Sequence, residues 1–294
     1  MGKSKEITDD YELTAGIHTF CIKTEDTINK EYMFPDGVIK TSSSVLENKK
    51  TKIIINANKM SGFLYTYSDF VSTLAEILDE LQIKNYDLIR TDMCFDSYDS
   101  AHYQKYAKLN RLIISMIGHA YSVKNKYKTN DLFTNKQLSV AIKNPNSFEV
   151  ENYDKEYESG GRDIAKSRFE IRSTRMNPKT IEEEFILNWD RRFKKSLSCF
   201  DETLDRYNFE LKNIYCEEKS KNPNMKWSTF FQMYQNCIFT KEQAINLLNL
   251  LGEESAEDKY KYFKKKYHLE TYTKADIFAA INEIKRARDE YFMG

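Results

Sequence analysis

The sequence lacks the patterns that mark several common classes of protein. It has only four prolines, and 40% of its 294 residues are apolar, so a folded core is expected rather than disorder. Its five cysteines are scattered and form no C-x-x-C pair, which suggests neither a zinc site nor a disulfide framework. No apolar run approaches the length of a membrane span, and residues 1–10 carry no apolar signal core. We therefore expect a cytoplasmic protein with reduced thiols and no membrane partner.

The sequence also lacks two common catalytic motifs, and its formal net charge is zero. No Gly-x-x-x-x-Gly-Lys occurs, so no ATPase or helicase is built into the chain. No Gly-x-Ser-x-Gly occurs, so Ser-His-Asp hydrolysis has no support. Lys+Arg and Asp+Glu both number 45, which argues against binding of nucleic acid through an overall positive surface. A local basic groove on an enzyme stays compatible with this balance.

The elements that the sequence does predict divide the chain near residue 178. Strands are expected at 17–23, 32–34, 37–39, 52–57, 87–96, 120–127, 137–142, 148–154 and 167–174, and helices at 68–81 and 101–121. After Pro178 only helices are expected. Three of them are predicted at 179–197, 201–216 and 227–237, and two more begin at the capping-box patterns of Thr240 and Thr273. These patterns predict an α+β part, residues 1–178, followed by an all-helical region, residues 179–294.

The strand expected from Asp87 to Asp96 has one apolar and one ionic face. Because side chains alternate along a strand, one face carries Ile89, Thr91, Met93 and Phe95, and the other carries Arg90, Asp92, Cys94 and Asp96. The first face suits a core. The second face holds two carboxylates and a guanidinium, a set that fits either a solvated surface or a metal site.

The strand expected at 167–174 shows the same division, with Arg168, Glu170 and Arg172 on its ionic face. If the two strands pair, Asp92, Asp96 and Glu170 converge as oxygen ligands for a hard divalent cation such as Mg²⁺ or Mn²⁺. The neighbouring arginines suit a phosphate, since a guanidinium matches its geometry. Two half-exposed strands joined by cross-strand salt bridges would show the same pattern, and alternation alone favours that interpretation.

A tyrosine lies on the polar face of a third expected strand. Glu149, Glu151, Tyr153 and Lys155 share this face, opposite Phe148 and Val150. With a metal to hold the phosphate and a lysine nearby, a phenol can attack a phosphodiester and form a covalent phosphotyrosine. The chain has 20 tyrosines, so for Tyr153 in isolation the interpretation as an amphipathic surface residue is favoured over that as a nucleophile.

In their order and spacing, the three stretches resemble the Rep_trans family of rolling-circle replication initiators, found on plasmids, phages and integrative elements of Gram-positive bacteria. The motifs that carry the resemblance are Arg90-x-Asp92-x-x-x-Asp96, then Tyr153-Asp154-Lys155 with trailing acidic residues, then Arg168-x-Glu170-x-Arg172. The resemblance covers about residues 50–175. The family often has an aliphatic residue immediately before its tyrosine, whereas this chain has Asn152.

The resemblance implies an antiparallel β-sheet nicking domain that cleaves one DNA strand at an origin, with a helical region for DNA recognition or oligomerisation. Tyr153 would be the nucleophile, and the products would be a 5′-phosphotyrosyl intermediate and a free 3′-OH primer. The residues implied to bind Mg²⁺ or Mn²⁺ are Asp92, Glu170 and Asp96, and those implied to contact the phosphate or orient the tyrosine are Arg90, Lys155 and Arg172. The implied partners are supercoiled, single-stranded or hairpin origin DNA, a host helicase and a second copy of the chain, in the bacterial cytoplasm.

Two alternatives stay open at this point. The same chemistry would serve a relaxase that nicks a conjugative element for transfer. A DNA-binding protein that kept the fold without cleaving would show the same motifs. A further class of nickases uses a His-hydrophobic-His metal motif, and it is disfavoured because the four histidines, His18, His102, His119 and His268, include no such pair.

Lysines interleaved with aromatic residues mark two candidate DNA-binding segments, at 124–128 and 259–267. The lysines predicted to bind DNA are Lys124, Lys126, Lys128, Lys261, Lys264 and Lys265. The second segment also fits an amphipathic helix with Tyr262 and Phe263 buried and its lysines solvated.

Overall fold

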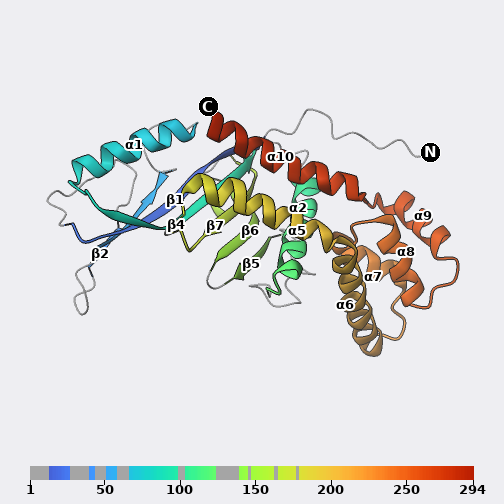
Figure 1. Cartoon of the computed structure of the whole chain (residues 1–294). Coiled ribbons are helices and arrows are strands. Elements are labelled where there is room, and N and C mark those ends of the chain that lie inside the picture. Colours follow the sequence, from blue (N-terminus) through green and yellow to red (C-terminus); the bar gives the residue numbers. More distant parts are fainter. Residues whose placement is uncertain are drawn as a thin grey trace.

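The computed structural model shows an α+β protein built on one antiparallel sheet, as the sequence predicts (Figure 1). The structure describes residues 13–26, 40–43, 51–57, 66–98, 103–123, 139–144, 147–161, 165–176 and 179–294. Among the helices of these residues, none combines the length and the apolar character that crossing a membrane requires.

The described part of the sheet has seven strands, and all neighbouring strands are antiparallel. Their order across the sheet is β2 (Lys40–Ser43), β3 (Thr51–Asn56), β1 (Leu13–Thr24), β4 (Tyr86–Ser97), β7 (Ser167–Ser173), β6 (Phe148–Asp154) and β5 (Val140–Asn144). The two long strands, β1 and β4, pair along most of their length. The three stretches with ionic faces therefore become the neighbouring strands β4, β7 and β6, which confirms that the strands at 87–96 and 167–174 pair.

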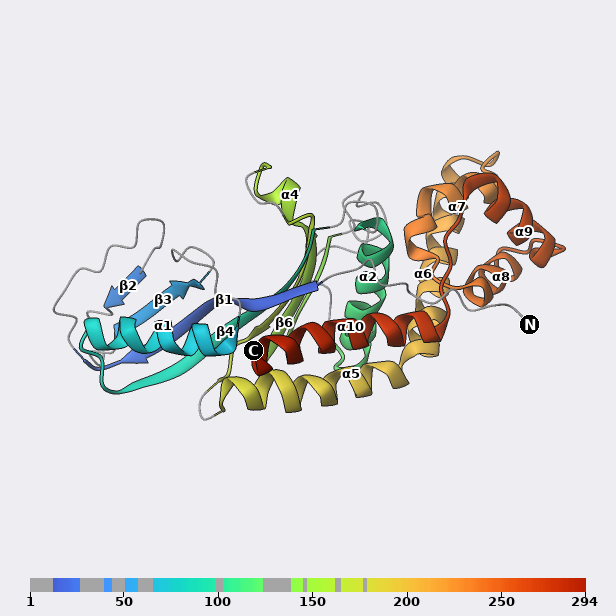
Figure 2. The ribbon, with the colours of Figure 1, turned by 90° about the horizontal axis from the view of Figure 1, so that it is seen from above.

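Helices cover the apolar face of this sheet. They are α1 (Tyr67–Glu80), α2 (Tyr103–Ala120), α5 (Trp189–Ser198) and α10 (Lys274–Met293). Figure 2 shows α1, α10 and α5 on one side of the sheet and the short α4 (Lys155–Glu158) on the other. The apolar residues predicted for the covered face, such as Met93, Phe95 and Ile171, are 2% exposed or less. Burial of this face is the main force that holds the helices on the sheet.

The remaining C-terminal helices gather at one end of the molecule, beyond α2 (Figures 1 and 2). They are α6 (Phe200–Lys221), α7 (Trp227–Tyr234), a short 3₁₀ turn at Gln235–Cys237, α8 (Lys241–Leu250) and α9 (Ala256–Tyr267). A buried lysine joins them to α2, because the Lys108 Nζ donates to the backbone oxygen of Glu270 at 2.8 Å. Burial lowers the pKa of Lys108 to about 8.

Both predicted helix starts in this region are capped. At α10, the Thr273 side chain and Asp276 form a complete capping box. At α8, the Thr240 side chain accepts from the backbone N–H of Gln243, but the Gln243 side chain accepts from Phe239 rather than from Thr240. Gly252, just after the end of α8, has φ +77°, a conformation that glycine adopts without strain.

Some expected elements differ from the structure or fall outside its described part. The strand expected at 120–127 is wrong where it is described, because α2 continues to Ala120 and a turn follows at Tyr121 and Ser122. The helix therefore includes only the first residue of this segment. The strands expected at 32–34 and 37–39 lie outside the described residues. Helices from beyond residue 178 pack on the sheet, and the division of the chain into two domains at that residue stays a prediction.

A buried glutamate ties the strand β7 to the first helix after residue 178. Glu184 lies in a π-helical turn (Glu183–Asn188) that leads into α5, and it is fully buried. Its carboxylate accepts hydrogen bonds from four side chains, at 2.6 to 2.9 Å: Ser173, Lys179, Asn188 and Arg192. Burial acts to raise the pKa of the Glu184 carboxyl, but Arg192 and these hydrogen bonds outweigh burial, so the pKa lies below its ordinary value of 4.5.

We expect Glu184→Gln to lower the free energy of unfolding at neutral pH by about 3 kcal/mol, because Arg192 loses its buried counter-charge. A carboxyl whose pKa is depressed by folding stabilises the protein above its unfolded-state pKa, and this stabilisation is lost as the pH falls through the folded-state pKa. The difference between wild type and variant should therefore shrink as the pH falls below 4.5. Urea unfolding at several pH values measures it. Glu183→Gln, an exposed neighbour, is the control, and an equal effect of both variants would contradict the role of Glu184.

Candidate functional site

The ionic faces of β4, β7 and β6 meet in three rows across the sheet. The strand register places Asp92 opposite Arg172 and Arg172 opposite Glu149 in the first row. The second row is Cys94, Glu170 and Glu151, and the third is Asp96, Arg168 and Tyr153. In an antiparallel sheet, directly opposed side chains lie close enough to touch. The three separate sequence motifs thus become one polar surface on the face opposite the helices α1, α5 and α10.

A β-bulge in β1 adds a histidine to this surface. Ile17 pairs with Met93 and Thr19 pairs with Asp92, so His18 has no partner on β4. Before the bulge the residues of β1 that belong to the hydrophobic core are Leu13, Ala15 and Ile17, whereas after it they are Phe20 and Ile22. The bulge therefore shifts the alternation by one residue and puts His18 and Thr19 together on the polar face. The Nδ1 of His18 lies 3.6 Å from the Oε1 of Glu170.

His18, Asp92 and Glu170 form a group that fits a metal ion. One ligand atom from each of them lies within 4.8 Å of the others. The side chains of Asp92 and Glu170 are only 2% and 1% exposed, and that of His18 is 19% exposed, so the group is reached from one side. Two carboxylates and an imidazole make a donor set that suits Mn²⁺ and related divalent ions, and carboxylates suit Mg²⁺. Two of the three residues of this group, Asp92 and Glu170, were predicted from sequence as candidate metal ligands.

His18 was not predicted as a candidate ligand, because it forms no His-hydrophobic-His pair and lies outside the three motifs. The one available signal is the break in apolar alternation between Ile17 and Phe20, which is typical of a bulge. Asp96, the third predicted ligand, lies outside the group. Its carboxylate accepts two hydrogen bonds of 2.6 Å from Arg168, which is itself only 1% exposed. Asp96 therefore holds Arg168 in place beneath the polar surface.

Arginines neutralise the buried carboxylates of the group. Arg90 donates from Nε and Nη2 to the two oxygens of Asp92, at 2.7 and 2.5 Å. Burial raises the pKa of Asp92 above its ordinary value. The interaction with Arg90 acts to lower this pKa but does not outweigh burial. Arg172 donates from Nε to Glu170 at 2.7 Å. Burial acts to raise the pKa of Glu170 as well, but the hydrogen bonds from His18 and Arg172 prevail and lower it.

The predicted nucleophile lies directly on this group. The hydroxyl of Tyr153 donates to Oε2 of Glu170 at 3.0 Å. Burial and the negative charge of Glu170 raise the pKa of the Tyr153 phenol, whereas the charge of Arg168 acts to lower it. Lys155 lies with its Nζ 5.8 Å from the centre of the Tyr153 ring. Positive charge brought close to Tyr153 would favour its phenolate.

The chain leaves the strand just after the tyrosine. Lys155 was expected to continue β6, but it begins the short helix α4, which Asp154 caps by accepting from the backbone N–H of Tyr157. Lys155 pairs there with Glu158 at 2.7 Å. Gly160 and Gly161 have φ +65° and +76°, which lets the chain turn back toward β7. Tyr153 thus lies near the end of β6, beside an exposed turn.

Asn152, the residue that departs from the Rep_trans pattern, points to the other face of the sheet. It is fully buried, and its Oδ1 accepts from the Nδ2 of Asn110 on α2 at 2.9 Å. Asn152 therefore lies on the face opposite the polar surface, where its Oδ1 has a partner and its Nδ2 has none among the described residues.

None of the predicted DNA-binding lysines belongs to the metal group of His18, Asp92 and Glu170. Lys261, Lys264 and Lys265 are exposed on α9, which buries Tyr260 and Phe263. Tyr262, which the amphipathic interpretation places in the core, is instead 53% exposed, with Lys266 near its ring. An aromatic ring and several lysines thus share the solvent side of α9. Lys124, Lys126 and Lys128 lie outside the described residues.

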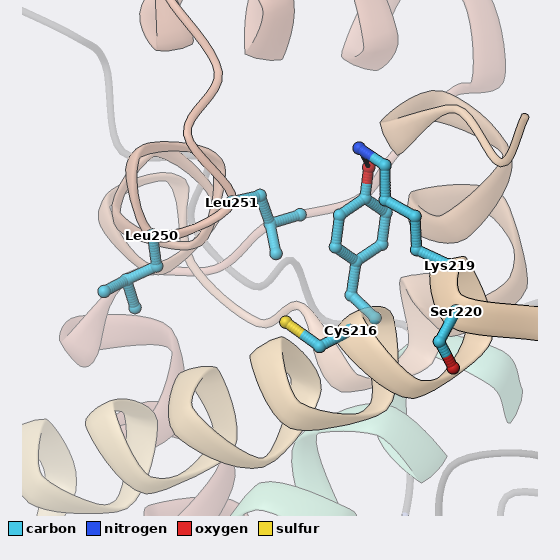
Figure 3. A pocket seen from close by; sticks show the side chains of 6 residues that line it. Cys216, Lys219, Ser220, Leu250 and Leu251 are labelled. Carbon is cyan, nitrogen blue, oxygen red and sulfur yellow. Dashed lines mark hydrogen bonds between the residues drawn. The ribbon is translucent and has the colours of Figure 1, made fainter. Parts of the chain in front are cut away.

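A surface pocket lies elsewhere, between α6 and the end of α8 (Figure 3). Its lining residues are Tyr215, Cys216, Lys219, Ser220, Leu250 and Leu251. None of them belongs to the predicted site residues, and the lining offers only one cation, Lys219, which lies 3.3 Å from the Tyr215 hydroxyl. The pocket contributes nothing to the chemistry of the polar surface.

Comparisons with known proteins were made at three levels. No family model and no curated protein matches this chain. Among solved structures, a rolling circle replication initiator protein from Geobacillus stearothermophilus is similar with a TM-score of 0.30 and 11% identity, over 56% of this chain and 75% of that chain. A likeness of this size assigns no function to the present chain.

The metal group can be tested by its effect on stability. A ligand that binds only the folded state stabilises it by about 2.7 kcal/mol at a concentration of 100 times its Kd. We therefore expect saturating Mn²⁺ to raise the melting temperature of the wild type but not that of His18→Gln or Asp92→Asn. His119→Gln, which changes a histidine paired with Glu202 on α6, should respond like wild type. A melting temperature that Mn²⁺ raises equally in all four proteins would place the metal elsewhere.

Proposed function

We propose that this protein is a metal-dependent tyrosine nickase that cleaves one strand of DNA at an origin and thereby initiates rolling-circle replication. The observation that carries the proposal is the hydrogen bond of 3.0 Å from the Tyr153 hydroxyl to Glu170, since Glu170 also belongs to the group with His18 and Asp92. A phenol, a group fit for a divalent cation and several arginines share one surface. That is the combination that transesterification of a phosphodiester requires.

In this proposal Tyr153 Oη attacks the phosphorus of one phosphodiester. A bond from the tyrosine oxygen to phosphorus forms, and the bond from phosphorus to the 3′ oxygen breaks. The phenol proton of Tyr153 passes to water, and the leaving 3′ oxygen takes up a proton from water and becomes the 3′-OH primer, while the 5′ end stays on the tyrosine. The reverse reaction rejoins the strand. A divalent cation bound at the group would polarise the phosphate and stabilise its developing charge.

The side chains around Tyr153 have separate roles in this scheme. Glu170 orients the phenol, and its lowered pKa makes it a poor base, so it positions the hydroxyl rather than removing its proton. Lys155 and Arg168 supply positive charge that favours the phenolate. Arg90, whose side chain is 40% exposed, is the arginine best able to reach a phosphate. Asp92, with His18 and Glu170, would hold the cation.

The proposed partners follow from the same scheme. The substrate is origin DNA that is supercoiled, single-stranded or folded as a hairpin, because a nickase must reach an accessible strand. Replication would need a host helicase, and a second copy of the chain is proposed as a further partner. The proposed location is the bacterial cytoplasm.

A relaxase that nicks a conjugative element would use the same residues, and the DNA site that the protein cleaves distinguishes the two. A DNA-binding protein that no longer cleaves is the alternative of another class. The raised pKa of the Tyr153 phenol is the observation that favours it, because an ionised nucleophile is harder to form. Detection of a covalent protein–DNA adduct excludes this alternative.

Tyr153→Phe should abolish nicking, because the nucleophilic oxygen is lost while the aromatic ring is kept. Tyr157→Phe is the matched control, since Tyr157 lies four residues away in sequence and is 69% exposed. The measurement is conversion of supercoiled plasmid carrying its own origin to the open circle with Mn²⁺, together with the DNA-linked protein band on a denaturing gel. If Tyr153→Phe nicks as well as wild type, or if Tyr157→Phe loses the adduct, the nucleophile is assigned to the wrong tyrosine.

The α9 lysines should contribute to DNA binding without affecting the chemistry. For duplex DNA, the logarithm of the binding constant falls with the logarithm of salt concentration by about 0.9 for each phosphate neutralised. We expect Lys261→Gln, Lys264→Gln and Lys265→Gln together to lower this slope by about 0.9 for each lysine that contacts a phosphate. Replacement of Lys212, Lys219 and Lys221 on α6 by Gln removes the same charge and should leave the slope unchanged. Equal slopes for both triple variants would rule out α9 as a DNA contact.

A further inference from the structure

One guanidinium lies among the carboxylates of three strands. Arg172 Nε is 2.7 Å from Oε1 of Glu170 and 3.9 Å from Oδ2 of Asp92. Its Nη1 is 2.9 Å from Oε1 of Glu149 and 3.1 Å from Oε2 of Glu151. The same guanidinium therefore contacts two residues of the metal group with one nitrogen and two other acids with another.

This arrangement places Arg172 where a metal ion needs to bind. Of the two oxygens of Glu170, Oε2 already accepts from Tyr153, and Oε1 faces both His18 and Arg172. A cation held jointly by His18 and Glu170 must take Oε1, because that oxygen lies 3.6 Å from the imidazole nitrogen. The cation then displaces the Nε of Arg172. Two positive groups cannot share one carboxylate oxygen at contact distance without strong repulsion.

Glu149 and Glu151 lie on the side of Arg172 away from the metal group. They come from β6, and the register puts Glu149 directly opposite Arg172 and Glu151 directly opposite Glu170. Their side chains are 8% and 14% exposed, and Lys143 lies 3.8 Å from Glu149. Neither acid belongs to the metal group or contacts Tyr153 through any hydrogen bond described above. Their presence just before the nucleophile is left unexplained by nicking chemistry alone.

We propose that Arg172 is an internal counter-cation of the metal site, and that Glu149 and Glu151 retain its guanidinium when a divalent cation displaces it from Glu170. The inference rests on the metal site of the proposed function and deepens it. Because Nη1 is already bound to both acids, the guanidinium moves away from Glu170 without losing its partners. Glu149 and Glu151 are thus positioning residues, and they make the exchange of Arg172 for a metal ion less unfavourable.

The affinity of the site for a metal ion should depend on the charges of Glu149 and Glu151. When Glu149 and Glu151 are neutral, the guanidinium keeps only Glu170 and Asp92 as partners, so it competes more strongly with the metal. The loss of affinity therefore depends on Arg172 being present. If the two acids simply attracted the metal by their charge, the opposite dependence on Arg172 would be expected. Without Arg172 their charges would be uncompensated, so neutralising them would lower the metal affinity more than it does in the wild type.

The experiment is a titration of Mn²⁺ followed by the electron paramagnetic resonance signal of the free ion. The proteins compared are wild type, Glu149→Gln/Glu151→Gln, Arg172→Gln, and the triple variant that combines all three changes. Glu156→Gln/Glu158→Gln on α4 is the control, since it removes two acids near the site that do not contact Arg172. Thermal unfolding without metal confirms that each variant is folded. Should the double variant not fold, Glu151→Gln alone with and without Arg172→Gln gives the same comparison.

We expect the double variant to bind Mn²⁺ about tenfold more weakly than wild type, an energy within the range of couplings between contacting residues. In the Arg172→Gln background the same two changes should have a clearly smaller effect, and the α4 control should bind like wild type. An effect that is equal or larger without Arg172 overturns the proposal but leaves the metal site intact. Absence of Mn²⁺ binding in the wild type overturns the metal site itself.

Discussion

The buried carboxylate of Glu170 is the group on which the polar face of the sheet depends. It is fully buried, and a charge at such a depth is stable only when paired and hydrogen-bonded. Arg172, His18 and Tyr153 meet this requirement together, each from a different strand. The need to satisfy one buried charge thus brings the predicted nucleophile, a candidate metal ligand and an arginine to one point. Removal of Glu170 would leave all three without a common partner.

The rigidity of the site comes from the opposite face. Packing of α1, α2, α5 and α10 on the apolar side fixes the strands β4, β7 and β6 relative to one another. The Glu184 network ties the end of β7 to α5, and Asn152 ties β6 to α2 next to the nucleophile. Positions on strands hold side chains more precisely than positions on loops. The turn after Tyr153 differs from the strands, because Glu156, Tyr157 and Glu158 are exposed there.

Much of the fold and part of the candidate site could be predicted from sequence. The faces of β4, β7 and β6 followed from alternation, so Asp92, Glu170 and Tyr153 were found on one side before their pairing was known. The pairing confirmed that these faces meet. The prediction could not place Asp96, because alternation gives the face of a residue and not its partner, and Arg168 holds its carboxylate. It missed His18, because a bulge depends on how two strands are aligned.

The sequence by itself determined which side chains share a face, where the helices begin, and that an α+β part precedes a helical region. These properties depend on neighbours within a few residues, through the two-residue period of a strand and through local caps such as Thr273. Only the tertiary structure decided which faces meet and at what register. The contact of Arg172 with Glu149, Glu151 and Glu170 joins two strands, and it exists because one register satisfies the buried charges while burying the apolar face.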